Sequence, residues 1–397
     1  MWPFANDNFS SIMSNRRFEL LLQFLHVSSL PTPETTDKLH RIRPVVDRVV
    51  KNFMAAYTPQ RNLAIDESII AFKGRLSWIQ YMPNKPHKWG MKAWVLADSS
   101  NGYVWNWELY TGKQEREDGV GLAHQVVMSL TRPLQNKGYH IYCDNFYSSP
   151  ALFEELSTVG FQACGTVRSN RRGLSEVFKS KKLQKGEVYS EKVSDSSVLC
   201  LKWKDKRDVL LLSTIHDDDS MVEIQRRSRS VAGGIETIHK PKVIDDYNQH
   251  MGGVDQSDQL VLYYGYAHQQ AKWWKRVFFH LVDLSLVNAS ILYNSINQEK
   301  LTQMEFRIAV AKGLLNGYTK HQPKHFTVSQ NLPLRLTERA FPEKISTDCP
   351  YGGRLLCEVC RARGGKRSRT QYRCKVCKVP LHIECFEAFH TKLDYSK

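Results

Sequence analysis

The sequence predicts an α/β protein built on a mixed sheet, with flanking helices and a small metal-binding module near the end of the chain. Three observations predict it: helical periodicity in the first 60 residues, short β-branched runs from about residue 62, and nine cysteines of which six lie in the last 49 residues. The 397 residues, 42% of them hydrophobic, have room for two or three compact units with cores of their own. We therefore expect a globular chain.

The first predicted elements are helices. Residues 9–29 and 39–59 carry apolar side chains at helical spacing, and Pro59 ends the second helix. From residue 62 the expected order is strand, strand, strand, helix, strand. These segments are 62–74, 92–98, 103–112, 121–134 and 138–149. This order fits a mixed sheet in which the first and fourth strands are neighbours.

Each of those two strands carries an aspartate. Asp66 lies among apolar residues of the first strand and Asp144 lies on the fourth, so the carboxylates can meet although they are far apart in the sequence. A hydrogen-bonded structural acid is the alternative for each, but burying an isolated carboxylate is costly. Glu67 is expected to be a solvated neighbour or a supporting group, because alternate strand residues face opposite sides.

The chain then continues with a predicted helix and strand and changes in composition. The helix covers residues 149–160 and the strand covers 161–167. Residues 170–232 are rich in Lys, Arg and Ser, and polar turns separate three strand-like runs. The runs are 185–193, 197–204 and 208–216. This texture predicts an inserted β unit.

The stretch "HMGGVDQSDQ", residues 250–259, sets two glycines before two aspartates. Gly252 and Gly253 are expected to turn the chain from the sheet into a helix, and the spacing places Asp255 and Asp258 on one helical face. A solvated first turn, where the helix dipole favours acids, is the alternative. Acids from the first strand, the fourth strand and this helix together have the layout of a two-metal phosphoryl-transfer site for Mg²⁺ or Mn²⁺, which take oxygen ligands.

Charge indicates the class of partner. The net charge of +16 favours a polyanion, with nucleic acid first and an anionic membrane or an RNA-rich assembly behind it. No stretch approaches the roughly 18–20 apolar residues that span a bilayer, and the first residues lack the pattern of a signal peptide. We therefore expect an intracellular protein without a membrane span.

The clustered cysteines predict zinc. Two C-x2-C pairs stand thirteen residues apart and are followed by His, Cys and His, a pattern that supplies thiolate and imidazole ligands to tetrahedral ions. The candidate ligands are Cys357, Cys360, Cys374, Cys377, His382, Cys385 and His390. Two closed sites need an eighth ligand, for which Cys349 is the nearest candidate, and one complete site beside a vestigial one is the alternative. Similar modules occur in ubiquitin ligases and histone-tail readers.

Several basic and aromatic residues are candidates for DNA contact. A basic loop between the cysteine pairs can grip phosphate, serve as a nuclear import signal, or be solvated; it holds Arg361, Arg363, Lys366, Arg367 and Arg369. In "NKPHKWGMK", Lys85, Lys88 and Lys92 can position backbone phosphates or lie solvated on the surface. Trp273 in "AKWWKR" is a core or groove aromatic, or stacks on an unpaired base.

Five motifs in this order resemble the piggyBac transposase family and its domesticated relatives. They are "IDESIIAFKGR", "YMPNKPHKWGMKAWVLADSSNGYVWN", "CDNFYSS", "DYNQHMGGVDQSDQ" and the cysteine-rich finger, and together they cover essentially the whole chain. The resemblance implies an RNase H-like domain whose DDD triad cuts transposon ends and joins them to TTAA targets through hairpin intermediates. Carried over by motif, the triad is Asp66, Asp144 and Asp255, with Asp258 a further acid. Trp273 takes the place of a family tryptophan near the active site.

The resemblance also implies a domain plan, a duplex DNA partner, a homodimer and the nucleus. Helical dimerisation and DNA-binding segments would flank a catalytic domain that the β unit interrupts. The expected boundaries are 1–61 (helical, N-terminally truncated), 62–172 and 233–264 (catalytic), 173–232 (inserted), 265–335 (helical), 336–348 (linker) and 349–397 (zinc finger).

Two departures from the family pattern keep a second function open. Family members carry a region before the point at which this chain begins, and relatives often have a histidine where this chain has Ala340. The first function is an Mg²⁺-dependent transposase. The second is a domesticated or decayed nuclear DNA-binding protein that no longer transposes.

Overall fold

The computed structural model describes most of the chain. The described residues are 12–29, 35–83, 85, 87–112, 121–193, 196–227, 234–265, 272–315, 340–364 and 368–396. They belong to two compact units, one spanning Leu20–Asn316 and the other combining Met1–Glu19 with Gly317–Lys397. The larger unit holds the main sheet, and the smaller holds the cysteine-rich module.

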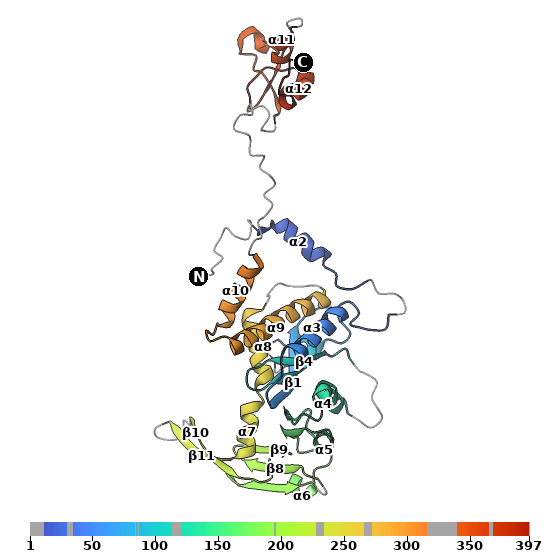
Figure 1. The fold of residues 1–397 in the computed structure, drawn as a ribbon, viewed down its shortest axis with the longest axis vertical. Helices are drawn as coiled ribbons and strands as arrows, with labels where there is room; N and C mark the ends of the chain where they lie inside the picture. Colours follow the sequence, from blue (N-terminus) through green and yellow to red (C-terminus); the bar gives the residue numbers. More distant parts are fainter. Residues whose placement is uncertain are drawn as a thin grey trace. The chain divides into compact units, whose positions relative to one another are not determined.

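A nine-stranded sheet lies at the centre of the larger unit (Figure 1). Its strands are β1 (Asn62–Ala71), β2 (Gln80–Tyr81), β3 (Trp89–Asp98), β4 (Val104–Leu109), β5 (His140–Cys143), β6 (Gln162–Thr166), β7 (Val188–Lys192), β8 (Leu199–Lys204) and β9 (Asp208–Ser213). The order is β2-β3-β1-β5-β6-β9-β8-β7, and β4 pairs with β3. β1 is parallel to β5 and antiparallel to β3. The predicted mixed-sheet, RNase H-like α/β fold is thus confirmed, with the first and fourth predicted strands as neighbours.

Helices pack against this sheet and explain its apolar strands. The helices described before residue 316 are α2 (Asn15–Phe24), which has no buried residue, α3 (Arg43–Ala56), α4 (Leu122–Thr131), α5 (Pro150–Thr158), α6 (Glu176–Ser180), α7 (Lys242–His250), α8 (Gly253–Tyr264), α9 (Trp273–Ile296) and α10 (Gln303–Leu315). Helices α8 and α9 contact β1, while α5 and α7 contact β6. All four residues of β5 are buried, because a central parallel strand is covered on both faces.

Among the described residues, α9 is the one helix long and apolar enough to cross a membrane by length and composition alone. Core helices of soluble proteins meet the same criterion. Val277, Leu281 and Leu284 of α9 are buried within the main hydrophobic core. Helix α9 therefore packs in the main hydrophobic core, as a long apolar helix of a soluble protein does.

The inserted strands form where they were predicted, but they continue the main sheet. β9 pairs antiparallel with β6, and β8 and β7 follow it outward. This pairing satisfies the backbone groups along β6, which would otherwise be an open edge. Two further strands, β10 (Met221–Arg227) and β11 (Ile235–Pro241), form a separate two-stranded ribbon. The proposed domain boundaries stay predictions, and residues 316–339 of the helical segment and linker lie outside the described residues.

The turn at the paired glycines differs from the prediction. Helix α7, not a strand, precedes it, so the turn joins two helices. Gly252 has φ −77° and needs no glycine conformation. Gly253 is required by space, since a Cβ there would lie 2.8 Å from the carbonyl oxygen of Asp98 at the end of β3.

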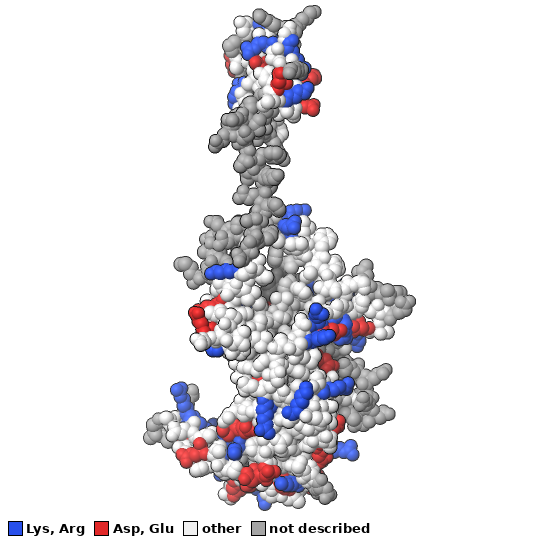
Figure 2. Space-filling view, in the orientation of Figure 1, with Lys and Arg blue, Asp and Glu red and all other residues white. Residues whose placement is uncertain are grey.

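The cysteine-rich module is small and has two short strand pairs. Its elements are β12 (Pro342–Lys344), β13 (Leu355–Leu356), α11 (Glu358–Ala362), β14 (Arg369–Thr370), β15 (Tyr372–Cys374) and α12 (Phe386–Thr391). Val359, Leu381 and Phe389 form its core together with Cys357 and Cys374. Figure 2 shows Lys and Arg side chains spread over this module. A core of this size needs further support, which bound metal can supply.

Candidate functional site

The sheet brings Asp66 and Asp144 together. In the parallel pairing of β1 with β5, Ala64 lies beside Tyr142 and Ile65 beside Cys143. Asp66 follows Ile65 on β1, and Asp144 follows Cys143 at the residue after β5 ends, where its charge contributes to the raised pKa of Asp66. The strands β1 and β5 are neighbours as expected, and the metal-binding roles of Asp66 and Asp144 stay predictions.

Burial dominates the electrostatics of this pair. Burial, and then the adjacent Glu67 carboxylate, raise the pKa of Asp66 to about 7. Burial also raises the pKa of Asp144, although the backbone N–H groups of Phe146 and Tyr147 stabilise its charged form. Asp66 Oδ1 accepts from Glu67 N at 2.8 Å, and Asp144 Oδ1 accepts from Phe146 N at 2.8 Å.

Helix α8 brings Asp258 to the same strand. Ser68 lies two residues after Asp66 on β1, and its Oγ donates to Asp258 Oδ1 at 2.6 Å. Burial raises the pKa of Asp258 to about 6, and the bond from Ser68 opposes that rise. Asp258 is therefore held beside the strand that carries Asp66, and its role in metal binding stays a prediction.

Asp255 lies less close to the other acids. It is exposed and lines a cavity of about 560 Å³ with Asp258, Lys85 and His87. Among the described residues, no three of the four predicted acids bring one oxygen each within 4.8 Å of one another. The structure thus gathers Asp66, Asp144 and Asp258 around β1 and leaves Asp255 at the open side.

Two of the three predicted phosphate-binding lysines face the acids. Lys85 Nζ donates to the Glu67 carbonyl at 3.3 Å, and its charge lowers the pKa of both Asp66 and Asp258. Lys92 Nζ lies 3.7 Å from Glu67 Oε2, and its charge lowers the pKa of Asp144. The third, Lys88, is exposed.

Glu67 is neither solvated nor turned away from the acids. Its side chain is 16% exposed, and Oε2 is buried without a hydrogen-bond partner. Tyr147 Oη is likewise buried without a hydrogen-bond partner, and its pKa is raised by burial and by the charge of Glu67. Of the two expected alternatives, Glu67 therefore fits the supporting group, since its charge raises the pKa of both Asp66 and Asp144.

An arginine that the sequence analysis did not single out holds the loop after β5. Arg171 Nη2 donates to the carbonyls of Asn145 and Phe146, and Arg168 Nε donates to Asn145 Oδ1 at 2.9 Å. These bonds fix the backbone that follows Asp144. The basic run "VRSNRR" was the available signal, but composition cannot show which carbonyls its arginines reach.

Trp273 packs as a core aromatic. It is half-buried against the main core and lies edge-to-face with Trp78, with ring centroids 5.3 Å apart. The structure places it among protein groups, and stacking on a base stays a prediction.

The cysteine-rich module forms two groups that can hold a metal ion. Cys357, Cys360, His382 and Cys385 make one group, and Cys374, Cys377 and His390 make the other. Within each group the ligand atoms lie within 4.8 Å of one another. Cys349 belongs to neither, so the described residues do not supply an eighth ligand.

Both histidines are oriented for metal binding. His382 turns Nδ1 toward Cys360 Sγ at 3.4 Å and Nε2 toward the Arg369 carbonyl at 3.3 Å. His390 turns Nε2 toward Cys377 Sγ at 3.7 Å and Nδ1 toward the Phe386 carbonyl at 2.9 Å. A carbonyl beside one ring nitrogen fixes the proton there and leaves the other nitrogen free to bind a metal.

The basic loop of the module is only partly described. Arg361 forms an ion pair with Glu358 at 2.8 Å, and the Arg369 guanidinium lies 4.2 Å from the ring centroid of Tyr351. Arg363 is exposed. Lys366 and Arg367 lie outside the described residues.

Comparison with known proteins adds a family. A family model described as "Transposase IS4" matches residues 2–290. PiggyBac transposable element-derived protein 3 of Homo sapiens is 27% identical over 399 residues, which cover 96% of this chain and 64% of that protein. PiggyBac transposable element-derived protein 2 of Homo sapiens is 26% identical over 326 residues, covering 78% and 54%. The chain thus spans less than two thirds of the length of these curated relatives.

One solved structure is similar over nearly the whole chain. It is the cryo-EM structure of a piggyBac transposase synaptic complex with hairpin DNA. The TM-score is 0.67 at 26% sequence identity, with 96% of this chain and 80% of that chain covered.

Proposed function

This chain belongs to the piggyBac-type transposase family, and from that premise we propose that it cuts and joins DNA by metal-dependent phosphoryl transfer. One observation carries the proposal. Asp66 lies on β1 and Asp144 follows directly after the neighbouring strand β5, and the bond from Ser68 to Asp258 joins helix α8 to the strand that bears Asp66. We assign Asp66, Asp144 and Asp255 to metal binding, with Asp258 in support.

The residues present fit Mg²⁺ or Mn²⁺. The site offers carboxylate oxygens, and burial raises the pKa of Asp66 and Asp144, so their ionised forms need nearby positive charge. When bound, two such ions supply an activated attacking oxygen and stabilise the leaving one. Lys85 and Lys92 offset part of the acidic charge. Asp255, on the open side of the cavity, lies where a DNA backbone can reach.

We further propose that the substrate is duplex DNA with TTAA-type targets, bound by a homodimer in the nucleus. The net charge of +16 supports a polyanionic partner, and the similar solved complex contains hairpin DNA. The basic loop of the module, Lys88 and Trp273 are the surfaces proposed for DNA contact.

We propose zinc as the ion of the cysteine-rich module. Three thiolates and an imidazole make one complete tetrahedral set, and two thiolates and an imidazole make a second set that lacks one described ligand. The metal would hold this small module together in place of a larger core.

Nicking of supercoiled plasmid DNA in Mn²⁺ tests the catalytic assignment. We expect Asp144→Asn and Asp255→Asn each to lower the nicking rate roughly a thousandfold, because each loses charge stabilisation worth several kcal/mol. Retention of DNA in a gel-shift assay should be unchanged. Asp47→Asn, an exposed acid on α3, is the matched control and should nick as the wild type does. Wild-type nicking by Asp255→Asn would remove that residue from the site.

The alternative function is DNA binding without transposition. Two observations favour it: the human relatives are named as derived from transposable elements, and Asp255 stands apart from the other acids. A chain of this kind would bind plasmid DNA and nick it in neither Mg²⁺ nor Mn²⁺.

A further inference from the structure

Helix α7 leads directly into α8, which carries Asp255 and Asp258. The chain leaves the site after Asp144, runs through β6 to β11, and returns only at α7. α7 ends at His250 and α8 begins at Gly253, so the placement of α7 limits where α8 can lie. Whatever joins α7 to the sheet therefore bears on the position of the α8 acids.

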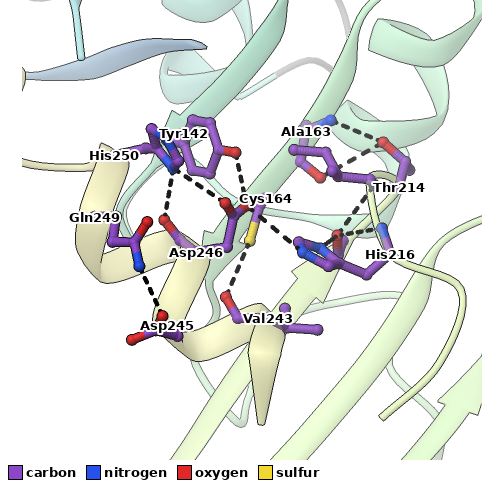
Figure 3. A network of polar contacts seen from close by, with 12 residues as sticks. Tyr142, Ala163, Cys164, Thr214, His216, Val243, Asp245, Asp246, Gln249 and His250 are labelled. Carbon is purple, nitrogen blue, oxygen red and sulfur yellow. Dashed lines mark hydrogen bonds and ion pairs between the residues drawn. The ribbon is translucent and has the colours of Figure 1, made fainter. Parts of the chain in front are cut away.

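A direct bond joins α7 to the strand that delivers Asp144. Tyr142 on β5 donates from Oη to Asp246 Oδ2 on α7 at 2.7 Å (Figure 3). Tyr142 is 1% exposed, and Asp144 follows it two residues later, just after β5 ends. The bond thus links the element carrying one acid to the helix that leads to two others.

The Asp246 carboxylate is held from three directions. His250 Nδ1, one turn along α7, lies 3.1 Å from Oδ1. His216 Nε2, in the segment after β9, lies 3.6 Å from Oδ2, and Ser213 Oγ contacts the Nδ1 of that ring at 2.9 Å. Figure 3 shows these side chains converging on Asp246 from β5, α7 and the segment after β9.

This bond lies beside a largely apolar contact, to which Thr166 Oγ1 and Tyr247 Oη add a longer polar contact of 3.5 Å. Val243 and Ile244 of α7 pack with Cys164 and Leu211 of the sheet in one hydrophobic cluster. Apolar packing alone permits small shifts between a helix and a sheet, whereas a hydrogen bond weakens steeply away from its best geometry. A polar anchor of this kind holds functional side chains more closely than packing does.

We propose that Asp246 is a positioning residue of the acidic site: through its bond from Tyr142 it fixes α7 against β5, and so sets where α8 holds Asp255 and Asp258 relative to Asp144. This inference rests on the proposed function for its consequence in metal binding. The tether itself is a statement about the fold.

Two readouts on the full chain test it. Tyr142→Phe and Asp246→Ala should each speed hydrogen exchange of the α8 amides and weaken binding of Mn²⁺ alone, measured by calorimetry, by about fivefold, the effect of one lost hydrogen bond. The double variant should be no worse than Asp246→Ala, because that change already removes the bond from Tyr142 together with the contacts of His250 and His216. Asp246→Asn keeps an oxygen that accepts from Tyr142 and should recover most of the Mn²⁺ affinity.

The matched control is the neighbouring acid on the same helix. Asp245 is 28% exposed against 23% for Asp246, and it bonds Lys240 Nζ and Gln249 Nε2, each at 2.7 Å, without reaching β5. We expect Asp245→Ala to keep wild-type exchange in α8 and wild-type Mn²⁺ affinity. If Tyr142→Phe and Asp246→Ala behave like Asp245→Ala in both readouts, the positioning role is overturned.

The two proposals fail in different ways. Absence of Mn²⁺ binding by the wild type would remove the proposed metal chemistry. In that case faster α8 exchange in Tyr142→Phe would still support the tether, and unchanged exchange would overturn it. Normal wild-type binding with an unaffected Asp246→Ala would overturn the tether alone.

Discussion

At the scale of single residues, the bond from Ser68 to Asp258 makes a prediction about pH. In Ser68→Ala the buried Asp258 loses the group that lowers its pKa, so that pKa should rise above its present value of about 6. We expect the acidic limb of the nicking profile to move to higher pH and the chain to lose about 1 kcal/mol of stability. Nicking rates from pH 5 to 9 and thermal melts measure both.

Ser285→Ala provides the comparison for that change. Among the described residues, its hydroxyl donates to the Leu281 carbonyl of its own helix, at 2.7 Å. The nicking profile of this variant should match that of the wild type. A profile for Ser68→Ala that also matches would show that Asp258 does not titrate in the reaction.

The sequence indicated which residues are candidates for function where their chemistry is unusual for their position. It did not indicate where their side chains point. Asp66 stood out because a carboxylate in an apolar strand needs a reason. The same reasoning could not show that Lys92 turns to Glu67, because its direction depends on the register in which Lys92 lies beside Ile69 across β3 and β1. The role of Arg171 could not be predicted either, because its hydrogen-bond partners are backbone carbonyls.

At the scale of elements, the two glycines before α8 should differ in their tolerance of a side chain. A Cβ at Gly253 would lie 2.8 Å from Asp98 O and 3.2 Å from Ser99 Cα, whereas a Cβ at Gly252 meets nothing within 4 Å. We expect Gly253→Ala to push α8 away from β3 and to cost about 1–3 kcal/mol, with a loss of nicking. Gly252→Ala should leave both unchanged. Thermal melts and the plasmid assay report the two quantities, and equal effects would contradict the close approach.

The sequence predicted the position of each strand better than it predicted which strands pair with one another. Every run expected between residues 62 and 216 contains a strand or a helix of the expected kind, because apolar periodicity is local. The pairing of β9 with β6 was not predicted, because the alternation of apolar and polar residues does not show which edge of a sheet a strand joins. The sequence did not predict helix α7, because this short helix follows β11 directly at Lys242 and has only two buried residues, Val243 and Ile244.

At the scale of the whole molecule, the two metal groups of the module should release their ions in order. The group of Cys374, Cys377 and His390 offers three described ligands, and the other offers four. We expect a titrated chelator to remove zinc from the three-ligand group first, and Cys360→Ser to abolish the tighter site. Cys349→Ser should change neither, because Cys349 belongs to neither group. Zinc released to a colorimetric dye gives the stoichiometry, and one-step release of two equivalents would contradict the order.

The buried acids should also make the stability of the metal-free chain depend on pH. The folded pKa of Asp66 is raised from 3.8 to about 7, so between these values the unfolded chain has released a proton that the folded chain still holds. Stability from this group therefore falls as pH rises through that window and stays reduced above it. Mn²⁺ binds the ionised form, so it should restore stability at pH 8 and do little at pH 5.

Other groups in the chain titrate with the opposite sign, and the measurement must separate them. Burial lowers the pKa of His280 to about 4, so the stability that His280 contributes to the folded chain rises with pH between about 4 and 6.5. The contribution of His280 cancels in the difference in melting temperature between the wild type and Asp66→Asn, because both chains keep His280. We expect the wild type to lose stability relative to Asp66→Asn from pH 5 to pH 8, by a few degrees. Saturating Mn²⁺ should stabilise only the wild type at pH 8, and a metal-free difference that is constant from pH 5 to 8 would show that Asp66 is ionised throughout.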